Sequence, residues 1–97
     1  MYNIDYFIEK FEQIPKEHWT KGSFQKGVRY CVYGHCGMTD AVVRTEESDA
    51  LDAICDKYNI SLVSVNDNDN PNFKQRSIKE RVLAALRFMK ELENESK

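Results

Sequence analysis

The stretch Asn66-Asp67-Asn68-Asp69-Asn70-Pro71-Asn72 separates an apolar segment before it from a long helix-forming segment after it. Asn and Asp side chains bond the neighbouring backbone and Pro fixes the φ angle, so all three residue types favour turns. The apolar run 62–65 must therefore leave the interior here, cross the surface and restart as a helix. Polar side chains gather at this crossing, and we expect a ligand or partner to be contacted there.

The segment after the crossing is predicted to be a helix over residues 77–93. Ser77 and Glu80 have the spacing of a capping box, in which each side chain bonds the backbone N–H of the other residue. One broad apolar face follows at helical spacing: Ile78, Val82, Leu83, Leu86, Met89 and Leu92. Phe88 widens this face beyond one stripe, which makes a homodimer through the helix an expectation. Residues 93–97 are polar and are expected to fray.

Two further helices are predicted, over residues 3–13 and 46–58. Asn3 can cap the first, and Pro15 ends it because the residue before a proline avoids helical angles. Pro15 can then begin a short second turn. Thr45 can cap the other helix, and Asn59 can stop it in the left-handed conformation.

The central run 28–43 is apolar and small, and periodicity alone does not separate helix from strand there. We expect a tightly packed helix whose glycines allow a neighbour to approach closely, and a short extended segment over 60–65. Trp19 and Phe24 are expected to join the helix stripes in the core. The predicted fold is a mainly α, single compact domain spanning 1–97, with about four helices and at most a short extended pair.

Composition excludes several classes of protein. The chain has 97 residues, of which 41% are hydrophobic, enough for one core but not for two domains. Its net charge of -2 provides no field for nucleic acid, so a nucleic-acid partner is not expected. No apolar run reaches the roughly 20 residues that a membrane-spanning helix requires. Three cysteines, an odd number, and the lack of a signal-peptide pattern indicate a soluble protein of the reducing cytoplasm.

The group Cys31, His35, Cys36 and Cys55 allows three interpretations. Residues 31 and 35 would share a helix face, so a thiolate and an imidazole could bind zinc, with Cys55 as a further ligand. His35 could instead activate Cys31 or Cys36 in a cysteine-dependent enzyme. A paired C-x-x-C is missing from the sequence, and small buried cysteines commonly fill cores. Core packing is the favoured interpretation, so we predict no catalytic residue, no metal and no cofactor.

A second group of residues could form a site for an anion or a nucleotide. Two arginines lie near the start of the last predicted helix, where backbone N–H groups and the helix dipole attract negative charge. Aromatic rings could stack on a base, and the Asn-Asp step offers hydrogen-bonding groups. The candidate ligand-binding residues are Trp19, Tyr33, Asn66, Asp67, Arg76 and Arg81. Ion pairs between the arginines and the acidic loop are the competing interpretation.

Four short motifs follow one another along the chain: Trp19-x-x-Gly22, then Cys31 followed by Gly34-His35-Cys36-Gly37, Val65-Asn66-Asp67, and Arg81-Val82-Leu83-x-Ala85-Leu86. In these motifs the chain, from about Ile4 to Leu92, resembles a group of uncharacterised small proteins of bacteria and their phages. The resemblance implies a bacterial or phage source and a mostly helical fold, and no chemistry. In that group the Asn-Asp step is soon followed by the last helix, whereas here residues 69–72 lengthen the connection.

The function expected from these observations is that of a small cytoplasmic binding protein that performs no reaction. Its partner would be another protein or a small anionic ligand. Two alternatives stay open. One is a nucleotide- or anion-binding phage protein that antagonises a host defence, and the other is the cysteine-dependent enzyme.

Overall fold

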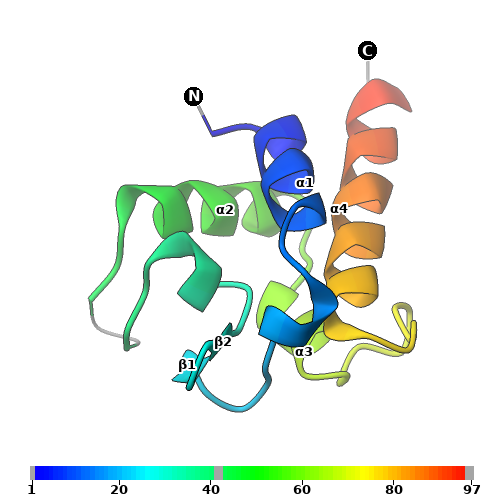
Figure 1. Ribbon diagram of the computed structural model, residues 1–97. Helices are drawn as coiled ribbons and strands as arrows, with labels where there is room; N and C mark the ends of the chain where they lie inside the picture. The colour runs from blue at the N-terminus through cyan, green and yellow to red at the C-terminus, as the bar shows by residue number, and fades with distance from the viewer. Residues whose placement is uncertain (1, 41–42, 96–97) are drawn as a thin grey trace.

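The computed structural model describes residues 2–40 and 43–95, and this part of the chain forms one mainly α domain, as the sequence predicts (Figure 1). Its α-helices are α1 (Ile4–Glu12), α2 (Glu46–Lys57), α3 (Leu62–Asn66) and α4 (Ile78–Glu95). A small antiparallel sheet pairs β1 (Gln25–Lys26) with β2 (Arg29–Tyr30), and single 3-10 turns occupy Lys16–His18 and Gly34–Cys36. None of the described helices is both long enough and apolar enough to cross a bilayer.

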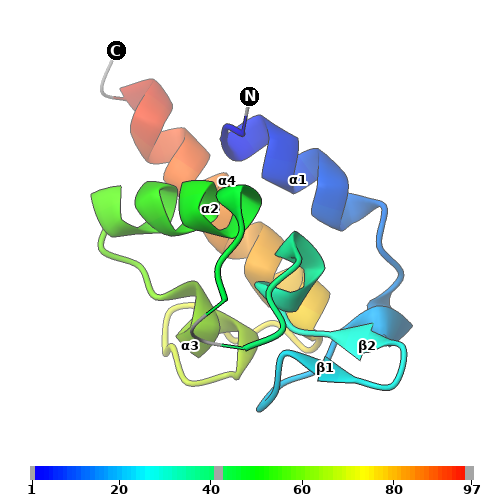
Figure 2. The same ribbon diagram turned by 90° about the vertical axis from the view of Figure 1, so that its left-hand side faces the viewer.

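Helices α1 and α4 lie side by side and antiparallel, so that the start of α1 and the end of α4 lie at the same end of the molecule (Figures 1 and 2). An ion pair between Lys90 and Asp5 joins them near that end, and Lys79 Nζ donates to the Glu12 carbonyl at 2.7 Å near the other. Fully buried side chains fill the space between them, among them Phe7, Phe11, Leu86 and Met89. This packing makes the pair the frame on which the rest of the chain is placed.

Helix α2 is attached to this frame through α1. The Tyr6 hydroxyl donates to Glu47, and Lys10 Nζ lies 2.6 Å from the other carboxylate oxygen of Glu47. The bond to Glu47, together with burial, raises the pKa of Tyr6 to about 12. Leu51 and Cys55 turn the apolar side of α2 into the core.

The predicted helix starts are confirmed by their caps. Asn3 Oδ1 accepts a hydrogen bond from Tyr6 N at 2.8 Å, and Ser77 Oγ accepts one from Glu80 N at 3.1 Å. Thr45 caps α2 in a reciprocal pair with Ser48, whose part in the cap the sequence analysis missed. The turn after Pro15 is also present as the 3-10 turn Lys16–His18. Residues 93–95, which the sequence predicts to fray, belong to α4, and residues 96–97 lie outside the described part.

The predicted helix over 28–43 is wrong. Residues 29–30 form β2, a 3-10 turn follows at Gly34–Cys36, and residues 41–42 lie outside the described part of the chain. Gly37 has φ +93°, a left-handed conformation that ends any right-handed helix. Gly34 faces the Phe24 carbonyl so closely that a Cβ atom there would lie 2.1 Å from its oxygen. Gly34 thus allows Phe24 at the start of the hairpin to approach closely, where the sequence predicts the close approach of a neighbouring helix.

The predicted extended segment over 60–65 is also wrong, because residues 62–66 form the helix α3. Ser61 caps this helix by accepting from Ser64 N at 3.4 Å, and Leu62 and Val65 face the core on one side of it. Helical spacing therefore turns Val63 outward, where it is 50% exposed. The short extended pair exists, but the hairpin β1–β2 supplies it. Trp19 is buried as predicted, whereas Phe24 is only partly buried.

Candidate functional site

Asn66 joins three segments that lie far apart in the sequence. Its side chain is 1% exposed, and its Oδ1 accepts a hydrogen bond from Val32 N at 3.0 Å. Its Nδ2 donates to the Thr20 carbonyl at 2.9 Å and to Asp67 Oδ1 at 3.0 Å. Asp67 Oδ1 in turn accepts from Gly22 N at 3.3 Å. The Asn-Asp step therefore fixes the loop before β1 and the chain after β2 against the end of α3.

Arg81 completes this arrangement from the first turns of α4. Its Nε donates to the Val65 carbonyl at 3.0 Å, and one terminal nitrogen donates to the Asn66 carbonyl, also at 3.0 Å. The other terminal nitrogen donates to the Gln75 carbonyl at 3.0 Å. Arg81 is 5% exposed, and burial lowers its pKa, while the charge of Asp67 opposes that shift. Its guanidinium caps the C-terminal end of α3 and is not offered to an external anion.

A small hollow opens above this network, and we call it the Cys31 hollow. Its volume is about 200 Å³, and it is lined by residues 22–24, by Cys31 and Val32, and by α3 together with Asp67. Phe24, Val32 and Val63 make its walls predominantly apolar, while the Asn66 side chain in its lining is already hydrogen-bonded. The hollow is therefore suited to an apolar group.

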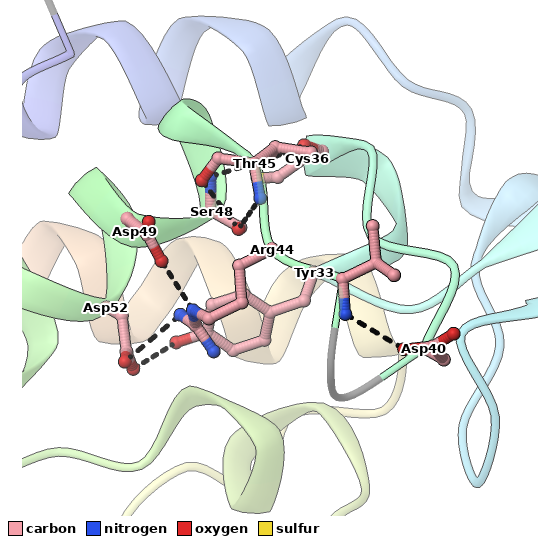
Figure 3. Close-up of polar contacts among 9 residues, drawn as sticks. Tyr33, Cys36, Asp40, Arg44, Thr45, Ser48, Asp49 and Asp52 are labelled. Carbon is pink, nitrogen blue, oxygen red and sulfur yellow. Dashed lines mark hydrogen bonds and ion pairs between the residues drawn. The ribbon is translucent and has the colours of Figure 1, made fainter.

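A second hollow, the Arg44 hollow, adjoins the first and shares Phe24 and Val63 with it. Its volume is about 300 Å³, and Arg44, Asp52 and Asp56 supply its charged side chains. Figure 3 shows the Arg44 guanidinium between the two carboxylates of Asp49 and Asp52, with which it forms ion pairs. The apolar part of its lining comes from Tyr33, Met38, Ile60 and Leu62.

The six predicted ligand-binding residues do not all line one hollow. Asn66 and Asp67 line the Cys31 hollow, and Arg81 lies behind it within the fold. Tyr33 lines the Arg44 hollow, where its hydroxyl donates to Asp52 Oδ1 at 3.2 Å. Burial raises the pKa of Tyr33, and the charge of Asp52 adds to that shift. Trp19 is buried in the core, and Arg76 is exposed.

The cysteines and His35 are built into the fold. Burial raises the pKa of Cys36 and of Cys55 to about 12 each, and it also raises the pKa of Cys31, whose sulfur accepts from Gly34 N at 3.4 Å. His35 Nε2 bonds the His18 carbonyl at 2.9 Å, so this nitrogen carries the proton and is not the base for a thiol. Nowhere in residues 2–40 and 43–95 do three His, Cys, Asp or Glu side chains gather closely enough to hold a metal ion.

The burial of His35 predicts a dependence of stability on pH. Burial lowers the pKa of His35 below its ordinary value of 6.5, so the unfolded chain binds this proton more readily than the folded chain. The free energy of unfolding should therefore stay constant above pH 6.5 with respect to this group and fall as the pH drops below it. The slope for one proton is at most about 1.4 kcal/mol per pH unit. Urea unfolding between about pH 5 and 8 measures it.

The variant His35→Phe is the matched test of that assignment. It keeps an aromatic ring beside Trp19, whose ring centroid lies 4.5 Å from that of His35, but it cannot titrate. Its stability should therefore change less with pH than that of the wild type below pH 6.5. Equal slopes for the two proteins would show that another group causes the pH dependence.

Comparisons with models of protein families, with curated proteins and with solved structures found no match for this chain. Sequence reasoning missed Phe24 and Val63 as surface groups and did not consider Arg44. Only Val63 carried a usable signal, because a helical interpretation of 62–66 places it opposite Leu62 and Val65.

Proposed function

We propose that this chain is a small cytoplasmic protein, of bacterial or phage origin, that binds another protein by contact and catalyses no reaction. The observation that carries the proposal is the Cys31 hollow, whose wall includes the half-exposed Val63. Exposed apolar surface beside a concave site is typical of places where a partner docks. The partner would insert an apolar side chain into this hollow.

The size and lining of the hollow favour a side chain over a nucleotide or small anion. Pockets for small-molecule ligands usually measure about 300–1,000 Å³, whereas the Cys31 hollow measures about 200 Å³. The cation expected to hold an anion, Arg81, donates to backbone carbonyls instead. Lys74 Nζ likewise donates to the Asn68 carbonyl at 2.7 Å. The nucleotide-binding antagonist of a host defence thus has less support than a protein-binding role.

The cysteine-dependent enzyme would have to use Cys31, because this thiol lines a hollow. Burial raises the pKa of Cys31, which keeps the thiol protonated and weakens it as a nucleophile. His35, the histidine that could activate this thiol, donates from Nε2 to the His18 carbonyl. These observations support binding over catalysis.

Capture of a partner from a lysate of the cells that express the chain tests the proposal. The wild type should retain a partner, and Val63→Asp should reduce its retention by about tenfold or more, because the new carboxylate would lose water inside an apolar contact. Position 63 lies in the first turn of α3, where an acidic side chain suits the helix dipole, so this variant should fold. Thermal unfolding checks that it does.

A charge control makes the result specific. Val28→Asp introduces the same charge at a residue that is 72% exposed and lines neither hollow, so it should retain the partner as the wild type does. Equal retention by Val63→Asp and the wild type would refute the proposed site.

A further inference from the structure

The two hollows adjoin each other across the outer side of α3. Phe24 and Val63 line both hollows, so they form the apolar divide between them. Asp67 lies one helical turn beyond Val63, whose carbonyl accepts from Asp67 N at 2.9 Å. A partner segment that reaches over Val63 would thus touch both hollows at once.

The charges on this surface are unequal. Arg44 is the one cation that lines either hollow in the described part of the chain, and it is paired with both Asp49 and Asp52. Asp56, at the rim of the Arg44 hollow, forms no ion pair within the described residues. Asp67 in the Cys31 hollow accepts from neutral N–H groups, and its charge interacts with the buried Arg81 guanidinium. The excess of negative charge therefore lies in the Arg44 hollow.

The Arg44 hollow has the two properties that a long basic side chain requires. Phe24, Ile60 and Val63 offer apolar surface for its aliphatic stem. Asp56, which has no ion-pair partner among the described residues, offers a carboxylate for its charged head. Lys and Arg side chains commonly bury the stem in this way while the head stays near water. A carboxylate-bearing segment would instead meet uncompensated like charge.

We propose that the partner presents a cationic, apolar peptide segment, with an apolar side chain in the Cys31 hollow and a Lys or Arg side chain in the Arg44 hollow. This inference rests on the proposed function, since it specifies the chemistry of the partner that the same surface binds. The complementary charges would guide the encounter and reject acidic competitors, while the apolar side chain would provide most of the affinity.

Fluorescence anisotropy with short labelled Gly/Ser-based peptides tests the inference. One peptide series carries Leu and Arg at varied separations, a second carries Leu and Glu, and a third carries Ser and Arg. The Leu/Arg series should contain a peptide that binds the wild type, and the other two series should bind at least about tenfold more weakly. Raising the ionic strength from about 0.05 to 0.5 M should weaken the Leu/Arg peptide, because exposed charges are screened.

Charge variants of the intact protein locate the effect. Asp56→Asn should weaken the Leu/Arg peptide by about two- to fivefold, the range for one exposed ion pair. Glu17→Gln also removes one negative charge, but from the exposed 3-10 turn Lys16–His18 and outside both hollows, so it should leave the affinity unchanged.

The outcomes separate this inference from the proposed function. If no peptide of the Leu/Arg series binds, or if the Leu/Glu series binds equally well, the cationic segment is refuted, while the effect of Val63→Asp on partner capture still decides the contact function. If Asp56→Asn and Glu17→Gln weaken binding equally, the attraction is due to net charge and the Arg44 hollow is refuted as the site.

Discussion

Replacing Asn66 with alanine is expected to lower the free energy of unfolding by about 3–5 kcal/mol. The substitution leaves the Val32 N–H and the Thr20 carbonyl, both in buried residues, without their partner. Each unsatisfied buried group costs about 1–3 kcal/mol, and the lost side-chain volume adds to that cost. Because domains of this size are stable by only about 5–15 kcal/mol, the loss should be obvious in urea or thermal unfolding.

Two further variants show whether hydrogen bonding is the cause. Asn66→Asp keeps the shape of the side chain but loses the two N–H donors and places a carboxylate beside Asp67, so it should destabilise the protein at least as strongly. Asn94→Ala changes the same residue type at an exposed position of α4 and should alter stability by less than about 0.5 kcal/mol. A small effect of Asn66→Asp would contradict the role given to the amide.

Gly34→Ala should destabilise the protein by about 3 kcal/mol or more, because the added methyl group has no room. Its Cβ would lie 2.1 Å from the Phe24 carbonyl oxygen and 3.1 Å from the carbonyl carbon. That oxygen also accepts from Cys31 N at 3.2 Å, so moving Phe24 away breaks this hydrogen bond as well. Besides a lower unfolding temperature, the variant should show faster reaction of the Cys31 thiol with a labelling reagent.

Gly27→Ala is the matched control for that variant. Gly27 has φ +65° but open space around its Cα, so alanine there should cost only the roughly 1–2 kcal/mol of a left-handed residue. Gly34 is constrained by contact alone, and its larger loss would therefore measure the close approach of the hairpin. Equal losses at the two glycines would contradict the steric explanation.

The helices that the sequence predicted well are those whose stability is encoded locally. In α1 and α4, apolar side chains recur at helical spacing, and Asn3 and Ser77 mark the starts with side-chain caps. Thr45 does the same for α2. These signals depend on residues at most a few positions apart, so no knowledge of the tertiary structure is needed to recognise them.

The errors lie where distant residues decide the local structure. The run 28–43 contains small apolar residues that suit a helix or a strand, and its conformation is decided by the contact of Gly34 with Phe24 and by the left-handed Gly37. Helix α3 has five residues, too few to form a stable helix alone, and depends on Arg81 and on burial of Leu62 and Val65. Neither dependence can be read from a short window of sequence.

The candidate site was predicted in part. The Asn-Asp step was identified as a place where polar groups converge, and the structure gathers three chain segments on Asn66. The sequence predicts that Arg81 binds an anion, whereas in the structure it donates to backbone carbonyls. Its position in the sequence is compatible with either role, so the sequence alone does not decide between them. The sequence does not predict the exposure of Phe24, which it assigns to the core, or of Val63, because that exposure follows from the hairpin and from α3.

The bonds from Arg81 to the end of α3 also set the order in which the molecule can be completed on the ribosome. The donor for the Asn66 carbonyl lies 15 residues later in the chain, so it is synthesised after α3 itself. Until it emerges, a nascent chain has a five-residue helix with no independent stability and hence no firm wall for the Cys31 hollow. A partner that recognises this wall would not bind unfinished chains and would bind only those in which α4 has begun to dock.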